Sequence, residues 1–454
     1  MKRNQKKGLS LLIISVLMLS LLSACAGKAN EKTGGNEPVG GNEPAETTAA
    51  NDKQEPAPEK PPEPVTLTLM APWSKEQVAE RIGDAVKEKY PHITVETTSK
   101  WTDKKDLEEM FAKNVVPDLL LTTDGFGVLQ EMDLLYPLDE PLEGLNFDFS
   151  RISSGAQEAI RARDPEGQGR LIGVPIEDVF VALHYNKDIF DKFGVPYPKD
   201  GITWDEVLDL AKKLTGERDG VKYYGFASTT SMSQAMTQLS ASGTDPETGE
   251  PQFSKNPAFE KFYSLVKSFA DIPGNWEKGI AYDFSKKDVA MSLGLTSNTI
   301  PFFPEDLNYD VVSFPTWSDL PGVGPSNLPL SLAVNKQSKH IEEALKVLDL
   351  LMNDDQLTRL SRIGVSVSSS NQDILQQFAA DRMKSPKNIK GMYSLTPAKP
   401  APYSKFGPDI LLYGTNFVGS QVTPFLESGD DVKTFLRKMD ETYAATVKEI
   451  QSKK

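Results

Sequence analysis

The chain has 454 residues, which is enough for about two or three domains of ordinary size. Its formal net charge of −14 argues against a nucleic-acid partner, because phosphate groups are recognised by basic surfaces. A single cysteine excludes an internal disulfide and a thiolate cluster for a metal ion.

The start of the chain has the composition of an export signal. Basic residues lie within the first seven positions, and an apolar stretch follows at 9–22. That stretch is shorter than the roughly 20 residues of a membrane span. The run Leu22-Ser23-Ala24-Cys25 resembles the lipobox of bacterial lipoproteins, which implies cleavage after residue 24 and an acyl chain such as palmitate on Cys25. An ordinary signal peptide with a chance cysteine is the alternative. We expect the mature chain to be lipid-anchored on the extracytoplasmic face of the cell membrane.

Residues 25–64 differ in composition from the rest. After Cys25 they are rich in Pro, Gly and Glu, contain no aromatic residue, and repeat the sequence GGNEP at 34–38 and 40–44. Such a segment buries too little apolar surface to offset the entropy of ordering it. It is therefore predicted to be a disordered tether. A Pro-rich motif that binds a partner is the alternative.

From residue 65 strands and helices alternate. Val65-Thr66-Leu67-Thr68-Leu69 alternates as a half-buried strand does, and Ser74 and Gln77 have the spacing of a capping box. Further elements are a helix that ends before Pro91, a strand at 93–95, a helix at 107–111 and a buried strand at 117–121. This order is typical of an α/β fold, in which ligands bind outside the carboxyl ends of the strands.

The loops after these strands carry the first candidate ligand contacts. Trp73 and Trp101 offer rings that could stack on the apolar face of a sugar, and Asp124 could accept hydrogen bonds from hydroxyls. Phe126 is a weaker candidate. The alternatives are structural: packed rings for the aromatic residues, and a helix cap or turn for Asp124.

Several segments in order carry a resemblance to a known family. They are Gly173–Asp178, His184–Phe190, Thr203–Glu206, Asp245–Gly249, Asn256-Pro257, Phe284–Met291, Phe314–Thr316 and Leu332–Lys339. Together they are similar to extracellular solute-binding proteins of ABC importers, the family that includes maltose-binding proteins. Lys287 stands where that family has glycine. After Met291, many sugar-binding relatives have Gly-x-Trp, whereas this chain has the run Gly294–Asn298, in which Ser297 and Asn298 could hydrogen-bond a ligand but no ring can stack on it.

The resemblance implies two α/β lobes joined by a hinge, with the ligand in a cleft between them. Lobe one is expected at 65–178 plus 331–375, and lobe two at 179–330 plus 376–454. One of Glu177 and Asp178, beside the hinge, is expected to face the ligand. From lobe two, Trp276, Ser297, Asn298 and Trp317 are the candidates, with core packing as the alternative for the two tryptophans.

No catalytic residue, metal or cofactor is expected. The three histidines are scattered, and no nucleophile elbow or phosphate loop follows a strand. The resemblance implies a lipid-anchored solute-binding subunit that delivers a carbohydrate, best matched by an oligosaccharide, to an ABC permease with a separate ATPase. The alternatives are a binding protein that serves a sensor or surface complex without transport, and a glycan-active enzyme, since two catalytic acids can lie far apart in a chain. Peptide, polyamine and anionic ligands also stay open.

Overall fold

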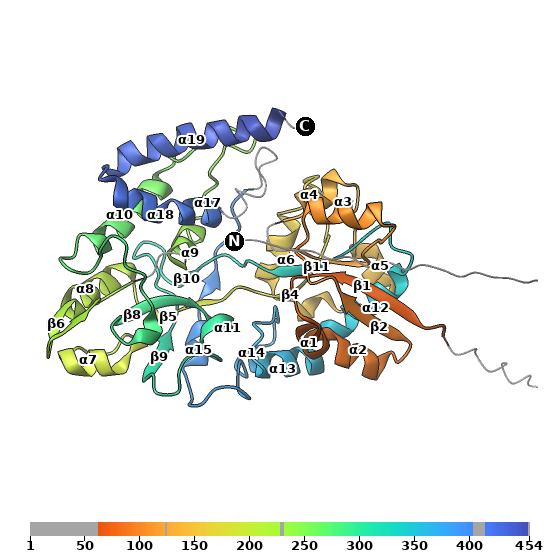
Figure 1. Cartoon of the computed structure of the whole chain (residues 1–454), viewed down its shortest axis with the longest axis horizontal. Helices are drawn as coiled ribbons and strands as arrows, with labels where there is room; N and C mark the ends of the chain where they lie inside the picture. The colour runs from red at the N-terminus through yellow and green to blue at the C-terminus, as the bar shows by residue number, and fades with distance from the viewer. Residues whose placement is uncertain (1–61, 123–124, 228–230, 403–413, 453–454) are drawn as a thin grey trace, which may run out of the picture. The chain divides into compact units, whose positions relative to one another are not determined.

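The computed structural model describes residues 62–122, 125–227, 231–402 and 414–452 (Figure 1). All of the elements below lie in the unit Pro61–Lys454. Cys25 and the predicted tether up to residue 61 lie outside the described residues, and so does Asp124. Within the described ranges, no helix is both long enough and apolar enough to cross a bilayer.

The first sheet has five strands in the order β2-β1-β3-β11-β4. β1 pairs in parallel with β2 and β3, whereas β11 runs antiparallel between β3 and β4. The strands are β1 Val65–Met70, β2 Ile93–Thr97, β3 Leu119–Thr122, β4 Val174–Glu177 and β11 Leu330–Val334. The predicted strands at 65–69, 93–95 and 117–121 are therefore confirmed, with small shifts at their ends.

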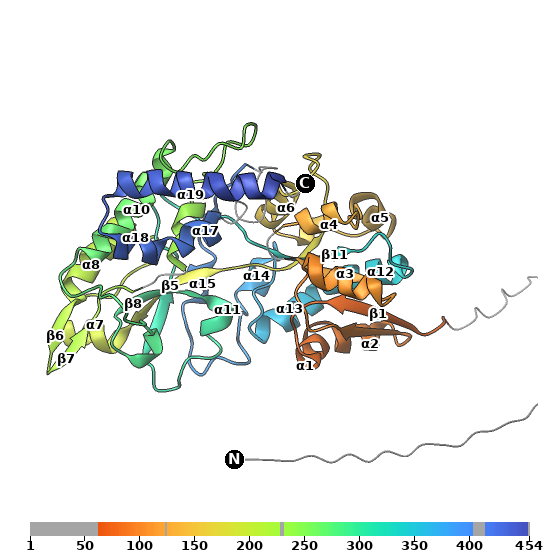
Figure 2. The same ribbon diagram turned by 45° about the horizontal axis from the view of Figure 1, so that its top comes forward.

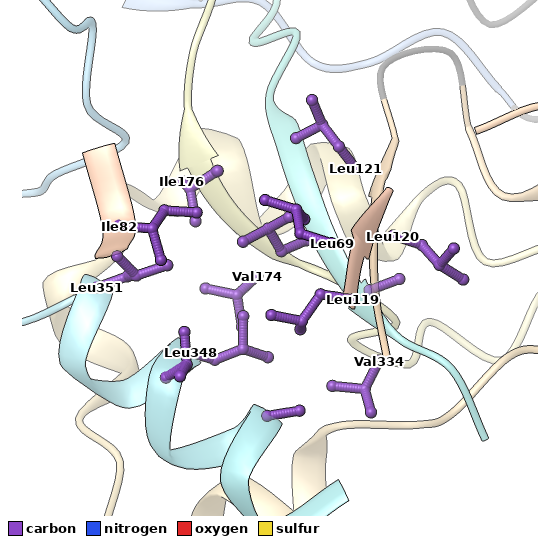
Figure 3. Packing of buried hydrophobic residues seen from close by; sticks show 14 of the residues in the cluster. Leu69, Ile82, Leu119, Leu120, Leu121, Val174, Ile176, Val334, Leu348 and Leu351 are labelled. Carbon is purple, nitrogen blue, oxygen red and sulfur yellow. The ribbon is translucent and has the colours of Figure 1, made fainter. Parts of the chain in front are cut away.

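Helices flank this first sheet. They are α1 Lys75–Val78, a π-helical turn Ala79–Gly83, α2 Asp84–Lys89, α3 Lys104–Ala112, α4 Gly127–Glu131, α5 Asp139–Gly144, α6 Ser154–Arg161, α12 Ile341–Leu351, α13 Asp354–Arg362 and α14 Gln372–Leu375. The capping box is confirmed, because Ser74 and Gln77 each accept a hydrogen bond from the other's backbone amide. Figure 3 shows Ile82, Leu348 and Leu351 gathered beside Val174 and Ile176 of β4.

The second sheet is antiparallel, in the order β8-β5-β9. Its strands are β5 Val181–Asn186, β8 Met291–Leu295 and β9 Tyr309–Val312; the hairpin β6 Gly216–Arg218 and β7 Val221–Tyr223 and the short pair β10 Val323–Gly324 and β12 Thr396–Pro397 lie apart from it. The chain enters this sheet directly, since β4 runs on into β5 (Figure 1).

The helices around the second sheet include three from the end of the chain. They are α7 Lys187–Phe193, α8 Trp204–Leu214, α9 Gln234–Thr237, α10 Pro257–Ala270, α11 Thr296–Thr299, α15 Ile389–Met392, α17 Gly414–Ser420, α18 Val422–Ser428 and α19 Val432–Ser452. Thr203 and Glu206 form the second capping box, and Asn256 caps α10 with a proline in its first turn, as the sequence predicts. α18 and α19 pack against α10 (Figure 2).

Buried apolar residues form three clusters. The first draws its members from 67–176 and 332–375, and we call this part lobe one. The second and third draw theirs from 181–317 and 378–443, and we call this part lobe two. Segments 178–180 and 325–329 connect the two parts, and a third connection follows α14, between Leu375 and Phe378. The lobe boundaries given by the sequence stay a prediction.

Candidate functional site

The carboxyl ends of β1 and β3 lie side by side, because these strands are parallel neighbours. The loop that leaves β1 is held by hydroxyls from the end of β2 and from the loop that follows β2. Thr97 Oγ1 donates to the carbonyl of Ala71 at 3.2 Å, and Ser99 Oγ donates to the carbonyl of Trp73 at 3.1 Å. This strand-end edge of lobe one is therefore a well-supported platform, and we call it the strand-end site.

Trp73 and Glu177 come together at this edge through a residue that the sequence analysis did not single out. The guanidinium of Arg81 lies 4.9 Å from the centre of the Trp73 ring and forms an ion pair with Glu177, the last residue of β4. Burial lowers the pKa of Arg81. One face of the Trp73 ring is thus occupied, and only 8% of the residue is exposed. In the sequence, Arg81 lies between the apolar positions Val78 and Ile82 of the first predicted helix. This position next to the buried face is the sequence signal that places Arg81 near the same part of lobe one.

The side chain of Asp178 does not point toward Arg81 and Trp73 but toward the second connection between the lobes. Its carboxylate accepts hydrogen bonds from the amides of Val179 at 2.8 Å and Leu328 at 2.9 Å, and from the side chain of Asn327. Its own amide donates to the carbonyl of Ser366 at 2.7 Å. Burial raises the pKa of Asp178 to about 6, although the hydrogen bonds to its carboxylate lower the pKa. Asp178 therefore ties the first connection between the lobes to the second.

The remaining lobe-one candidates have different environments. Trp101 is 54% exposed in the loop between β2 and α3, so its ring is available to a ligand. Phe126 is 2% exposed and packs against Gly173, where an added Cβ would come within 3.0 Å of the ring. Core packing accounts for the burial of Phe126.

The lobe-two candidates are not gathered in one place. Trp276 lines a small apolar cavity of about 40 Å³ inside lobe two, together with Phe269 and Tyr282. Trp317 is buried in the lobe-two core and donates its indole N–H to the carbonyl of Ala235 at 3.2 Å. Ser297 is half-buried and Asn298 is exposed on α11, directly after β8.

A larger cavity of about 270 Å³ lies at the connections between the lobes. Its walls come from the start of α6 at 153–155, from 179–181, from 324–327, from 369–375 and from 392–397. Polar side chains such as Asn327 and aromatic ones such as Phe180 and Tyr393 share this lining. The cavity could not be predicted from the sequence, because its walls run from Ser153 to Pro397 along the chain and no local pattern links them.

The described residues contain no group of three His, Cys, Asp or Glu side chains that could hold a metal ion. His184 is buried between its contacts with the Ala182 carbonyl at 3.2 Å and Thr299 Oγ1 at 3.0 Å. Burial lowers its pKa to about 4, so the ring is neutral at physiological pH.

The molecule has two sheets, each with its own helices, and the chain connects them three times. With loops at the strand ends, this arrangement defines a two-lobe solute-binding fold. A family model described as bacterial extracellular solute-binding protein matches residues 66–357. The chain belongs to this family, which is a family of binding proteins.

Similarity to curated relatives is partial. The chain is 33% identical over 123 residues to the sn-glycerol-3-phosphate-binding periplasmic protein UgpB of Brucella abortus, covering 26% of this chain and 27% of the relative. It is 30% identical over 203 residues to another binding protein of that organism, covering 41% and 48%. The chain thus spans about a quarter to a half of the length of these relatives.

Solved structures share the fold across most of the chain. An ABC substrate-binding protein of Listeria monocytogenes in complex with cycloalternan superposes with a TM-score of 0.62 at 19% identity, covering 84% of this chain and 98% of that one. The sugar-binding protein MalE of Xanthomonas citri gives 0.64 at 16% identity, covering 85% and 98%. UgpB of Mycobacterium tuberculosis with glycerophosphocholine gives 0.63 at 14%, covering 85% and 99%. The expected two-lobe, maltose-binding-protein-like fold is confirmed.

Proposed function

We propose that this protein is the lipid-anchored, extracytoplasmic solute-binding subunit of an ABC importer. The observation that carries the proposal is the family match over residues 66–357, which covers strands of both sheets and the first two connections between the lobes. Such a subunit binds its solute between the lobes and presents the closed form to membrane permeases, which a separate ATPase drives. The run ending in Cys25 supports the anchor.

A carbohydrate, best matched by an oligosaccharide, is the proposed solute. Sugar rings present an apolar face to aromatic side chains and a rim of hydroxyls to carboxylates and amides. Trp101 is an exposed aromatic at the strand-end site, and Asp124 follows β3 in the sequence. Ser297 and Asn298 would supply hydrogen bonds from lobe two. A similar fold from Listeria monocytogenes holds the oligosaccharide cycloalternan, which agrees with this ligand class.

An organophosphate is the second candidate, because the curated relative with 33% identity binds sn-glycerol 3-phosphate. A phosphate calls for a cationic partner. Arg81 is the arginine that lies against Trp73 at the strand-end site, and it is already paired with Glu177. The geometry therefore favours the neutral sugar.

A thermal-unfolding screen of the purified chain separates the two ligands. We expect a maltooligosaccharide or cycloalternan to stabilise the protein and sn-glycerol 3-phosphate to leave it unchanged. A ligand at about 100 times its dissociation constant adds about 2.7 kcal/mol. Stabilisation by the phosphate alone would transfer the proposal to the second candidate, and hydrolysis of a glycan during the assay would support an enzyme instead.

The sensor alternative differs in its partner and not in its fold. Reconstitution of the chain with permeases encoded next to its gene distinguishes an importer subunit from a sensor subunit. An importer subunit stimulates ATP hydrolysis by the transporter when its solute is present. A histidine kinase that responds to the same complex, without any uptake, would support the sensor.

A further inference from the structure

The first connection between the lobes, at 178–180, is anchored at both of its ends. At the lobe-two end, the carbonyl of Phe180 accepts hydrogen bonds from Thr296, from its amide at 2.9 Å and from its hydroxyl at 3.2 Å. Thr296 is fully buried and begins α11. At the lobe-one end, the amide of Asp178 donates to the carbonyl of Ser366 at 2.7 Å. Only the middle of this short segment is therefore left to bend.

The second connection, at 325–329, is anchored in a similar way. The amide of Ser326 donates to Oγ1 of Thr237 on α9, in lobe two, at 3.1 Å. Leu330 pairs with Glu177 at the end of β4, in lobe one. The residues between these two anchors have no regular secondary structure. The middle of the second connection is thus also free of anchors to either sheet.

The carboxylate of Asp178 joins the middles of the two connections. Its Oδ1 accepts the amides of Val179, in the first connection, and of Leu328, in the second. Its Oδ2 accepts a hydrogen bond from the side chain of Asn327, also in the second connection. Asp178 is 3% exposed, so these bonds are shielded from water. The two connections are therefore cross-linked at the place where each would otherwise bend independently.

A carboxylate suits this position because three donors converge on it. An ionised carboxyl group only accepts hydrogen bonds, and its two oxygens have room for all three. Both oxygens of Asp178 are engaged with the protein, so the group has a structural partner set and not a ligand. Buried and paired polar groups of this kind favour one arrangement of the elements that carry them.

We propose that Asp178 is a positioning residue for solute binding, which makes the first two connections bend as one unit and limits the lobes to a narrow range of angles. Asp178 acts through the two connections and contacts no solute. Lobes that are already ordered lose less conformational freedom when a solute bridges them, which favours affinity. The proposal concerns the connections alone, so it goes beyond the proposed function and holds for any solute.

The distance between spin labels on the two lobes tests the proposal without any ligand. Cys25 is the only cysteine, so the full chain with Cys25→Ser can be labelled at two chosen positions. Lys105 on α3 and Lys213 on α8 are exposed and lie in different lobes. Lys105→Cys and Lys213→Cys therefore give the labelled parent, measured by pulsed electron paramagnetic resonance. We expect a narrow distribution of distances in this parent.

Substitutions at the cross-link should change the width of that distribution. Asp178→Ala removes all three bonds, and we expect the distribution to broaden by about twofold or more. Asn327→Ala removes one bond and should broaden it less. Asp178→Asn should restore the parent width, because its Oδ1 still accepts the amides of Val179 and Leu328 and its amide group faces a rotated Asn327.

Asp118→Ala is the matched control for lost stability. Asp118 is also a buried aspartate, at 4% exposed. Its carboxylate accepts the amide of Thr68 at 2.7 Å and the hydroxyl of Ser338 at 2.5 Å, and all three residues belong to lobe one. We expect Asp118→Ala to lower the stability of the chain, as Asp178→Ala does, and to leave the distance distribution unchanged.

Three results would overturn the proposal. They are a broad distribution in the labelled parent, an unchanged width in Asp178→Ala, and equal broadening in Asp178→Ala and Asp118→Ala. If Asp178→Ala does not fold, Asn327→Ala decides, and an unchanged width there counts against the proposal. Asp178→Asn as broad as Asp178→Ala would contradict the assigned hydrogen bonds. None of these results bears on the proposed function, which the thermal-unfolding screen tests separately.

Discussion

Lys287 occupies a backbone conformation that favours glycine. Its φ of 67° lies in the left-handed region, at the position where related proteins have glycine according to the sequence resemblance. We expect Lys287→Gly to raise the free energy of unfolding by about 0.5–1 kcal/mol, because the strain disappears. Chemical denaturation measures the change. Lys287→Ala is the control, since it removes the ion pair with Asp306 and keeps the strain; equal stability of the two variants would contradict the explanation.

Asp178 makes stability depend on pH in an unusual direction. Its pKa is about 6 in the folded chain against an ordinary 3.8, so the folded state holds the proton more tightly. The contribution to stability is complete below pH 3.8 and is lost as the pH rises through 6. Asp178→Asn removes this loss, because its amide can donate to Oδ1 of a rotated Asn327, an atom without a hydrogen-bond partner among the described residues.

We therefore expect Asp178→Asn to gain stability relative to the parent chain between pH 4 and 7, by on the order of 2–3 kcal/mol. Denaturation curves at a series of pH values measure the difference. The pKa of His184 is lowered to about 4, so His184 changes the pH dependence of stability in the opposite direction. Its effect is the same in the parent chain and in Asp178→Asn, and it therefore cancels when the two are compared. A constant difference across this range would show that Asp178 is ionised when folded.

At the level of single residues, the sequence predicts candidates but not their environments. Both Trp73 and Trp101 follow a strand, yet Arg81 covers one ring and the other is exposed. That difference depends on a helix position eight residues from Trp73. Likewise, the choice between Glu177 and Asp178 depends on Asn327, which lies about 150 residues away in the chain. Such contacts have no local signal.

Elements with a local signal were predicted well. Ser74 and Thr203 begin their helices with capping boxes because the necessary side chains lie within four residues. The π-helical turn Ala79–Gly83 was not predicted, since the apolar spacing of Val78, Ile82 and Val86 fits an uninterrupted α-helix.

The predicted tether is the element whose removal should have the least effect on binding. Residues 26–64 contain no aromatic ring and few apolar side chains, so we expect them to add reach and no binding energy. Deleting them should leave the affinity for soluble ligand within a factor of two in calorimetry. A change of tenfold, equal to about 1.4 kcal/mol, would mean that the segment contacts the ligand site.

For the molecule as a whole, we expect the transported solute to close the two lobes. A ligand shifts this equilibrium only by its differential affinity for the closed form, so it must contact both lobes. Small-angle scattering should show a smaller radius of gyration with ligand. Trp101→Ala should weaken binding by about 1–3 kcal/mol if the ring stacks on sugar. Tyr197→Ala, which alters a partly exposed ring elsewhere, is the control.

An unchanged radius of gyration at saturation would contradict closure. Wild-type affinity in Trp101→Ala would remove that residue from the site and leave the fold unaffected.

The place of β11 in the first sheet has a consequence for how the chain matures. Leu330–Val334 lies between β3 and β4, which precede it by about 150 to 210 residues. Until this late segment arrives, β4 lacks its neighbour in the sheet, and the first half of the chain cannot complete a core. We expect a chain truncated after residue 329 to show no cooperative unfolding of lobe one. Since long-range pairing is slow, we expect a newly made chain to stay open until residues 330–334 have been added.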